Sequence, residues 1–271
     1  SQVISELKKW SGKLIEIPYT KNISSSSIKS NIMKPYLQKD NRTSLLSRLI
    51  KVKDIVRIIE AHSPLSGLIA EKIQLKEKNK LIGFDGFWSS SLADSLIRGK
   101  PDNQSVDLST RISALNEILD ITSKTIIFDG DNGGRIEHLP LTINSMERQG
   151  VSAIVIEDKI GLKKNSLFKN QKDTKQDSIK NFCKKIKVAI NTRKSEDFLI
   201  VARIESLILN KGIKDALKRA KAYSRAGADA ILIHSKQKNP DEIFKFSKEF
   251  KKSEYAKPLI AVPSSYSKTY E

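Results

Sequence analysis

The sequence predicts an α/β fold, a (β/α)8 barrel of the TIM type whose eighth β/α unit is missing from this chain. After about residue 52, short apolar runs alternate with segments of helical periodicity, which is the order of βαβ units. The apolar runs are continuous, as is typical of strands covered on both faces in a parallel sheet. A doubly wound open sheet competes with the barrel, but no G-x-G-x-x-G motif follows the first apolar run.

Seven apolar runs are the expected strands, and each except the last precedes an expected helix. The strands are expected over 55–62, 81–88, 125–131, 153–159, 198–206, 230–235 and 258–266. The helices are expected over 66–78, 108–122, 137–149, 175–188, 212–226 and 240–252. An eight-fold barrel needs one more strand and helix. We therefore expect these 271 residues to be a fragment of a longer native chain.

The start of the chain differs in composition from the rest. Residues 1–45 are expected to be an N-terminal extension or linker, because the run 22–31 (NISSSSIKSN) is polar and rich in serine. Residues 46–271 are expected to form the incomplete barrel.

The composition is that of a globular protein, with 38% hydrophobic and 30% charged residues. No apolar run reaches the ~18 residues of a membrane span, and the single cysteine, Cys183, cannot form an internal disulfide. We therefore expect a cytoplasmic protein without membrane contact. The net charge of +18 comes mostly from lysines scattered along the chain, with only 6% aromatic residues, so it predicts a basic surface and no nucleic-acid site. Attraction of a small anionic substrate stays open.

Polar side chains stand at the ends of the expected strands, where a βα barrel carries its active site. They are Glu60, His62, Asp85, Trp88, Asp129, Asp131, Glu157, Asp158, Lys159, Arg203, Glu205, His234 and Ser235. Randomly scattered surface charge would not fall so regularly on the last residues of apolar runs. We expect these side chains to gather around one site.

Three of these residues are carboxylates on neighbouring strand ends, Asp129, Asp131 and Glu157. Residues i and i+2 of a strand point the same way, so the two aspartates can face one site. Oxygen ligands of this kind suit Mg²⁺, which keeps several waters and takes one or two carboxylates. The alternative is that the acids cap helices or pair with lysines.

Arg203 and His234 lie in or directly after apolar strands, where a buried polar group needs a partner. Arg203 is interpreted as a clamp for a phosphate or carboxylate group, with an internal ion pair to Glu205 as the alternative. His234 is interpreted as a hydrogen-bond donor to a phosphoryl oxygen, with a core polar network as the alternative.

The segment 157–166 reads EDKIGLKKNS, which is Glu-Asp-Lys, five residues, then Asn-Ser. It resembles the lid signature of the phosphoenolpyruvate phosphomutase family, within the isocitrate lyase/phosphoenolpyruvate mutase superfamily. Further segments are similar to that family in order and spacing: 60–71, 87–105, 128–138, 201–212, 226–236 and 258–266. The resemblance covers roughly residues 45–271. It implies a barrel of that superfamily's type and an isomerase that interconverts phosphoenolpyruvate and 3-phosphonopyruvate, the carbon–phosphorus bond-forming first step of phosphonate biosynthesis.

The resemblance also implies roles for single residues. Asp129 would hold Mg²⁺ directly, with Asp131 and Glu157 acting largely through its waters. The residues implied to bind substrate are Trp88, Ser90, Ser91, Leu92 and Ser166, with the substrate carboxylate at 90–92. The catalytic residues implied are Asp102, beside the moving phosphoryl group, and Asn165, Arg203 and His234, around that group. A lid over about 160–170 would close and exclude water.

Two positions depart from the family's pattern. Ser91 stands where glycine is frequent, and Asn132 stands where threonine is common. In the lid, Lys163 and Lys164 add charge near an anionic substrate, and solvation at the surface is an equal interpretation.

Phosphonopyruvate hydrolase is the nearest alternative function, because it would use the same metal site and let water take the phosphoryl group. Asn165 favours the mutase. Carbon–carbon lyases are disfavoured, since no cysteine follows the fourth expected strand, and a decayed barrel that only binds ligands is the non-enzymatic alternative. The resemblance further implies a homodimer or homotetramer at full length, and one interpretation makes residues 1–45 the tail of a fused nucleotidyltransferase.

Overall fold

The structure is a computed structural model, which describes residues 6, 9–11, 42–77, 80–161, 163–166 and 174–267. The chain divides into two compact units, Ser1–Tyr36 and Leu37–Glu271. Of the first unit only residues 6 and 9–11 are described, so the expected linker run 22–31 lies outside the described residues. The second unit holds the sheet, its helices and the candidate site.

A seven-stranded parallel sheet forms the centre of the second unit. In sheet order its strands are β1 (Ile58–Glu60), β4 (Gly86–Ser89), β5 (Thr125–Asp129), β6 (Ala153–Glu157), β9 (Leu199–Ile204), β10 (Ala230–Ile233) and β11 (Leu259–Ala261). β5 and β6 are buried along their whole length, as their continuous apolar runs predict. The prediction of a parallel sheet is confirmed.

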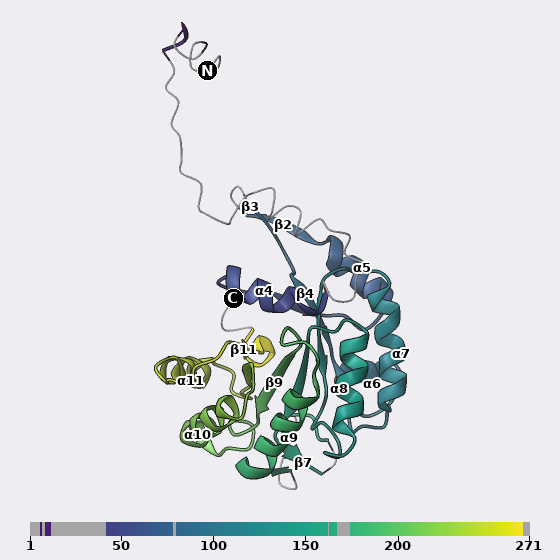
Figure 1. Cartoon of the computed structure of the whole chain (residues 1–271), viewed down its shortest axis with the longest axis vertical. Helices are drawn as coiled ribbons and strands as arrows, with labels where there is room; N and C mark the ends of the chain where they lie inside the picture. The colour runs from purple at the N-terminus through teal and green to yellow at the C-terminus, as the bar shows by residue number, and fades with distance from the viewer. Residues whose placement is uncertain are drawn as a thin grey trace. The chain divides into compact units, whose positions relative to one another are not determined.

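Helices follow the strands in the βα order that the sequence predicts. They are α4 (Leu45–Val52), α5 (Pro64–Lys72), α6 (Ser91–Leu96), α7 (Leu108–Leu119), α8 (Leu139–Arg148), α9 (Ile179–Thr192), α10 (Gly212–Arg225) and α11 (Asp241–Lys251), with a 3₁₀ turn, η1, over Pro263–Ser265. Figure 1 shows α7, α8, α9, α10 and α11 in an arc outside the strands. The side chains of Asp107 and Ser178 begin α7 and α9 by accepting backbone N–H hydrogen bonds.

The two faces of the sheet bury separate cores. Towards the helices, Ile126 and Phe128 of β5 join a large cluster with Met146 of α8 and Phe182 of α9. The inner face carries a second cluster, made of Leu46, Ile127, Ala153, Val155, Leu199, Val201, Ala230 and Leu232. Side chains alternate along a strand, so the residue two positions after an inner-face residue also points to the inner face. This alternation positions the site described below.

The segment between β1 and β4 differs from the prediction. α5 ends at Lys72, and an antiparallel hairpin of β2 (Gln74–Glu77) and β3 (Lys80–Gly83) follows, where the helix was expected to continue to residue 78. The second barrel strand begins only at Gly86.

This later start moves Asp85 away from the expected site. Asp85 lies just before β4, at the amino end of the strand, where its carboxylate accepts the Arg57 N–H at 2.8 Å and pairs with Lys53. The prediction that Asp85 ends a barrel strand was wrong, because the apolar run 81–88 covers parts of two strands.

A second small hairpin follows β6. β7 (Lys159–Ile160) pairs antiparallel with β8 (Lys175–Gln176), so the helix expected over 175–188 begins at Ile179. The two strands bracket the expected lid, of which residues 162 and 167–173 lie outside the described part of the chain. None of the described helices is long and apolar enough to cross a membrane.

Candidate active site

Four of the predicted site residues stand at the carboxyl ends of consecutive strands. They are Asp129, Glu157, Arg203 and His234, and each follows a residue of the inner core by two positions. The period-2 alternation of the strands therefore turns all four towards the inside of the curled sheet. The sheet register supports this proximity, since Glu157 of β6 is the direct partner of Arg203 in β9.

Most predicted site residues line one cavity of about 290 Å³. Those in its lining are Trp88, Ser90, Leu92, Asp102, Asp129, Asn165, Ser166, Arg203 and His234. The other three, Ser91, Asp131 and Glu157, contact residues of that lining, as the distances below show. Side chains from six separate strand ends and loops thus meet at one place.

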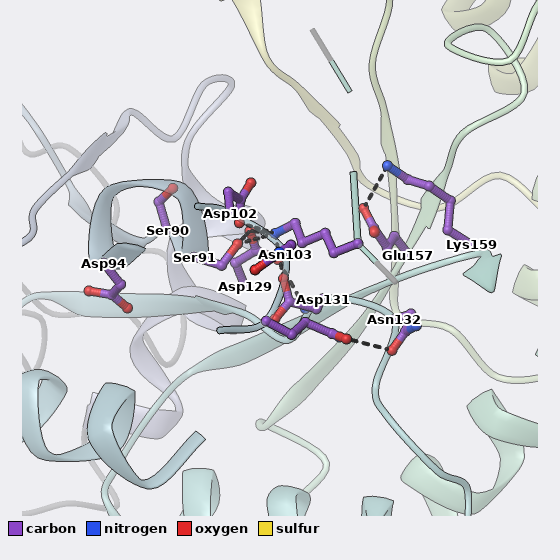
Figure 2. Close-up of polar contacts among 12 residues, drawn as sticks. Ser90, Ser91, Asp94, Asp102, Asn103, Asp129, Asp131, Asn132, Glu157 and Lys159 are labelled. Atoms are coloured by element: carbon purple, nitrogen blue, oxygen red, sulfur yellow. Dashed lines mark hydrogen bonds and ion pairs between the residues drawn. The ribbon is translucent and has the colours of Figure 1, made fainter. Parts of the chain in front are cut away.

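Asp129 lies at the centre of the acidic group. Its Oδ2 accepts the Ser91 hydroxyl at 2.9 Å, and its Oδ1 accepts the Asp131 N–H at 3.1 Å. Figure 2 shows Asp102, Ser91, Asp129 and Asp131 gathered together. Burial alone would raise the pKa of Asp129, but the nearby cations Lys163 and Arg111 hold that pKa well below its usual range. Asp129 is therefore an ionised, buried carboxylate.

Lys163 provides the cation at this group, and only 8% of the residue is exposed. Its ammonium contacts Asp131 and the Ser91 hydroxyl, and lies 3.3 Å from Asp102 Oδ1 and 3.5 Å from Asp129 Oδ2. Burial opposes a charge on Lys163, but Asp129 and Asp131 raise the pKa of the ammonium above its ordinary range. Of the two interpretations of this lysine, solvation at the surface was wrong. Its place in the lid motif was the signal that could have identified it.

The three predicted metal carboxylates do not form a closed set of ligands. Among the described residues, no three His, Cys, Asp or Glu side chains converge closely enough to hold a metal ion. Lys163 stands against Asp131 and Asp129, while Glu157 lies on the next strand. Both carboxylate oxygens of Glu157 are buried and accept no hydrogen bond from the described residues. Burial raises the pKa of Glu157 to about 7.

Arg203 joins the lid to the barrel. Its Nε donates to Glu205 Oε1 at 2.6 Å, and its Nη2 donates to the Ser166 hydroxyl at 2.8 Å. It also lies 3.7 Å from Glu157 Oε2. The internal ion pair considered for Arg203 is present, yet the guanidinium also lines the cavity, so it can serve both as a partner of Glu205 and as an anion contact.

His234 is buried and uncharged at neutral pH. Burial, together with the charge of Arg203, lowers the pKa of His234 to about 4. Its Nδ1 has no hydrogen-bond partner among the residues that the structure describes. A neutral imidazole carries one N–H donor, which suits a hydrogen bond to an anionic oxygen in the cavity.

The loop after β4 supplies the opposite wall. Ser90 is the N-cap of α6, and its Oγ accepts the Ala93 N–H at 3.3 Å. The backbone N–H groups at the start of a helix have no partner within the helix, so those of Ser91 and Leu92 are suited to a carboxylate. Asp102 follows α6 and reaches the same cavity beside Lys163.

A family model described as phosphoenolpyruvate phosphomutase matches residues 46–270. The chain belongs to the phosphoenolpyruvate phosphomutase family. The resemblance drawn from the lid motif is thus confirmed. A phosphoenolpyruvate phosphomutase of Tetrahymena pyriformis is 37% identical over 240 residues, which cover 88% of this chain and 75% of that protein. A phosphonopyruvate hydrolase of Variovorax sp. is also 37% identical, over 209 residues, 76% of this chain and 67% of that protein.

Solved structures of phosphoenolpyruvate phosphomutase relatives share the fold. A crystal structure of phosphoenolpyruvate phosphomutase from Streptomyces platensis subsp. rosaceus has a TM-score of 0.76 at 31% identity, covering 84% of this chain and 75% of that one. A phosphonopyruvate hydrolase in complex with oxalate and Mg²⁺ has a TM-score of 0.70 at 33% identity, covering 86% and 74% of the two chains. The α/β barrel type of the fold is therefore shown.

Proposed function

We propose that this protein interconverts phosphoenolpyruvate and 3-phosphonopyruvate, and so acts as an isomerase that moves a phosphoryl group between oxygen and carbon. The proposal rests on one observation. A single cavity is lined by Asp102, Asn165, Arg203 and His234 together. These are the four residues that the family resemblance assigns to the phosphoryl group, and they come from four separate segments. The mutases among the relatives support the same reaction.

The carboxylates of the cavity fit Mg²⁺ bound mostly through water. Asp129 is ionised and buried, and the two oxygens of Glu157 are buried without hydrogen bonds from the described residues. Mg²⁺ usually takes one or two protein carboxylates and keeps several waters, so a closed three-acid cage is not required. Asp129 would hold the ion directly, with Asp131 and Glu157 through its waters. The bound ion would stabilise negative charge on the enolate oxygen of pyruvate. The hydrolase relative solved with Mg²⁺ and oxalate supports this assignment.

The side chains of the chain would bind and enclose the substrate. Ser90, Ser91 and Leu92 would hold the substrate carboxylate, with Trp88 beside them. Arg203, His234 and Asn165 would surround the phosphoryl oxygens, and Asp102 would stand on the path of the phosphoryl group. Transfer of this kind has a loose transition state, so positioning and charge supply most of the catalysis. Lid residues such as Asn165 and Ser166 would exclude water, which otherwise takes the phosphoryl group.

Hydrolysis of phosphonopyruvate is the second candidate, and the 37% identity to a phosphonopyruvate hydrolase favours testing it directly. A coupled assay separates the two reactions. Phosphonopyruvate and Mg²⁺ are given to the protein, and pyruvate is read with lactate dehydrogenase, with and without pyruvate kinase and ADP. A mutase gives a signal only when pyruvate kinase is present. A signal without pyruvate kinase would overturn the mutase proposal in favour of the hydrolase.

The organisation of the whole chain extends this proposal. We propose that residues 1–45 are an extension or linker, and that residues 46–271 form a barrel without its eighth β/α unit. β1 and β11 each pair with one strand only among the described residues, which is consistent with the second point. We further propose that the protein is cytoplasmic and forms a homodimer or homotetramer. Light scattering of the full-length protein tests the oligomeric state, since a stable monomer would contradict the proposal.

A further inference from the structure

Arg111 is a buried cation beneath the acidic group, and the reaction as proposed does not use it. It lies on α7 and is 3% exposed. Its Nε donates to Asp94 Oδ2 at 3.0 Å, and its Nη1 donates to Asp131 Oδ2 at 3.4 Å. The guanidinium carbon lies 4.3 Å from the centre of the Phe128 ring. One side chain thus joins α6, through Asp94, to the loop after β5, through Asp131.

Asp131 needs such support from its surroundings. Its φ of 52° lies in the left-handed region, which aspartate adopts more readily than most residues but which still costs more than an ordinary helical or extended φ. Its two carboxylate oxygens are held by different cations, Oδ2 by Arg111 and Oδ1 by Lys163. Lys163 belongs to the lid, whereas Arg111 belongs to a barrel helix. The contact to Arg111 is therefore the one that does not depend on the position of the lid.

We propose that Arg111 is a positioning residue, which fixes the carboxylate of Asp131 at the divalent-cation site and ties that site to α6 through Asp94. This inference rests on the proposed function, because Asp131 is placed at the cation site by that proposal. Arg111 does not touch substrate or metal; it acts through Asp131.

Removal of a positive charge near a cation site would by itself strengthen cation binding, which opposes the weakening expected when Asp131 loses its fixed position. Arg111 is paired with Asp94, and both side chains are buried. Exchanging Arg111 for glutamine and Asp94 for asparagine together removes one positive and one negative charge from this buried pair. The net charge next to the site then changes little, and the loss of position at Asp131 dominates. Partners that orient metal ligands typically contribute about 10- to 100-fold to metal affinity.

The experiment measures Mn²⁺ binding, by electron paramagnetic resonance of the free ion, on the full chain and two variants. Arg111→Gln should weaken the Kd for Mn²⁺ about 10- to 100-fold. The double variant Asp94→Asn/Arg111→Gln removes the ion pair without leaving an unpaired buried charge. It should regain thermal stability relative to Arg111→Gln but keep the weakened Mn²⁺ affinity.

A matched control is Arg193→Gln, which breaks a different ion pair, with Asp229, and should lower stability without changing Mn²⁺ affinity. Wild-type affinity in the double variant would overturn the inference and leave the proposed function intact. A wild-type chain that binds no Mn²⁺ and does not turn over phosphonopyruvate would overturn the proposed function, and the inference with it.

Discussion

The Lys163 ammonium lies 3.3 Å from the Asp102 carboxylate, so a lid residue and the residue proposed to face the moving phosphoryl group are direct partners. Asp102 and Lys163 are both in the lining of the same cavity. This contact ties the lid to the loop after α6. It also offsets the charge of carboxylates that would otherwise repel an anionic substrate.

Lys163→Gln should reduce turnover strongly. The variant leaves Asp102, Asp129 and Asp131 close together without their shared cation, and it removes a positive charge from the substrate cavity. Loss of one such electrostatic contact typically lowers kcat about 100-fold or more. Steady-state kinetics with phosphonopyruvate measure the loss. The adjacent Lys164→Gln is the control, because Lys164 is partly exposed and its backbone carbonyl, which the substitution keeps, accepts a hydrogen bond from the Lys159 ammonium. Equal losses in both variants would contradict the role of Lys163.

Asp129→Asn should remove most of the stabilisation by Mg²⁺. A ligand present at 100 times its Kd stabilises the folded state by about 2.7 kcal/mol, and this gain depends on binding to the native site. Thermal unfolding with and without Mg²⁺ measures it. The wild type should shift upward in Tm and the variant should not. Because the exposed Glu137 lies outside the site, Glu137→Gln should keep the shift. An unchanged shift in Asp129→Asn would show that Asp129 is not the metal ligand.

The substitution Asp102→Ala should lower the turnover of phosphonopyruvate without lowering the affinity for oxalate. Oxalate resembles the enolate and has no phosphoryl group to meet Asp102, so calorimetry should find oxalate binding with Mg²⁺ nearly unchanged. Turnover of phosphonopyruvate should fall at least about 100-fold. The cavity keeps its other polar side chains in this variant. Near-normal turnover would make the assigned role of Asp102 wrong, and so would a parallel loss of oxalate affinity.

His234 should make the protein less stable as the pH falls from about 6.5 to about 4. The folded pKa of His234 is lowered to about 4 by burial and by Arg203, so in this window the unfolded chain takes up a proton that the folded chain does not. The full effect is about 3 kcal/mol. Denaturant unfolding of the wild type and His234→Asn should show a difference in stability that shrinks towards pH 4. The exposed His138→Asn is the control. A difference independent of pH would contradict the buried, neutral imidazole.

The strand ends could be predicted because they follow from two local patterns of the sequence. Continuous apolar runs indicated a parallel sheet, and the alternation of side chains placed Asp129, Glu157, Arg203 and His234 on one face. These positions depend only on local backbone geometry. The fold class and the part of the cavity lining that lies on strand ends could therefore be predicted in outline. The lining residues outside the strand ends were implied only by the family resemblance: Ser90, Leu92, Asp102, Asn165 and Ser166.

The rest depends on how long side chains cross between elements. Arg111 looks like an ordinary surface cation in the sequence, and for Lys163 a solvated surface position was an equal interpretation, yet both are buried against Asp131. Asp131 lies 20 positions after Arg111 and 32 positions before Lys163, and local patterns of helix and strand carry no information on such contacts. The hairpin of β2 and β3 was missed because β2 continues the helical pattern of the expected helix 66–78, while β3 lies within the apolar run 81–88 that was taken as one strand.

Phosphorus NMR of the reaction mixture tests the central claim most directly. The protein is incubated with phosphonopyruvate and Mg²⁺, and the phosphorus signals are followed until they stop changing. We predict that the phosphonopyruvate signal is replaced by that of phosphoenolpyruvate, the more stable form, with no early rise of inorganic phosphate. Formation of inorganic phosphate and pyruvate without phosphoenolpyruvate would contradict the claim that this cavity transfers the phosphoryl group within one substrate molecule.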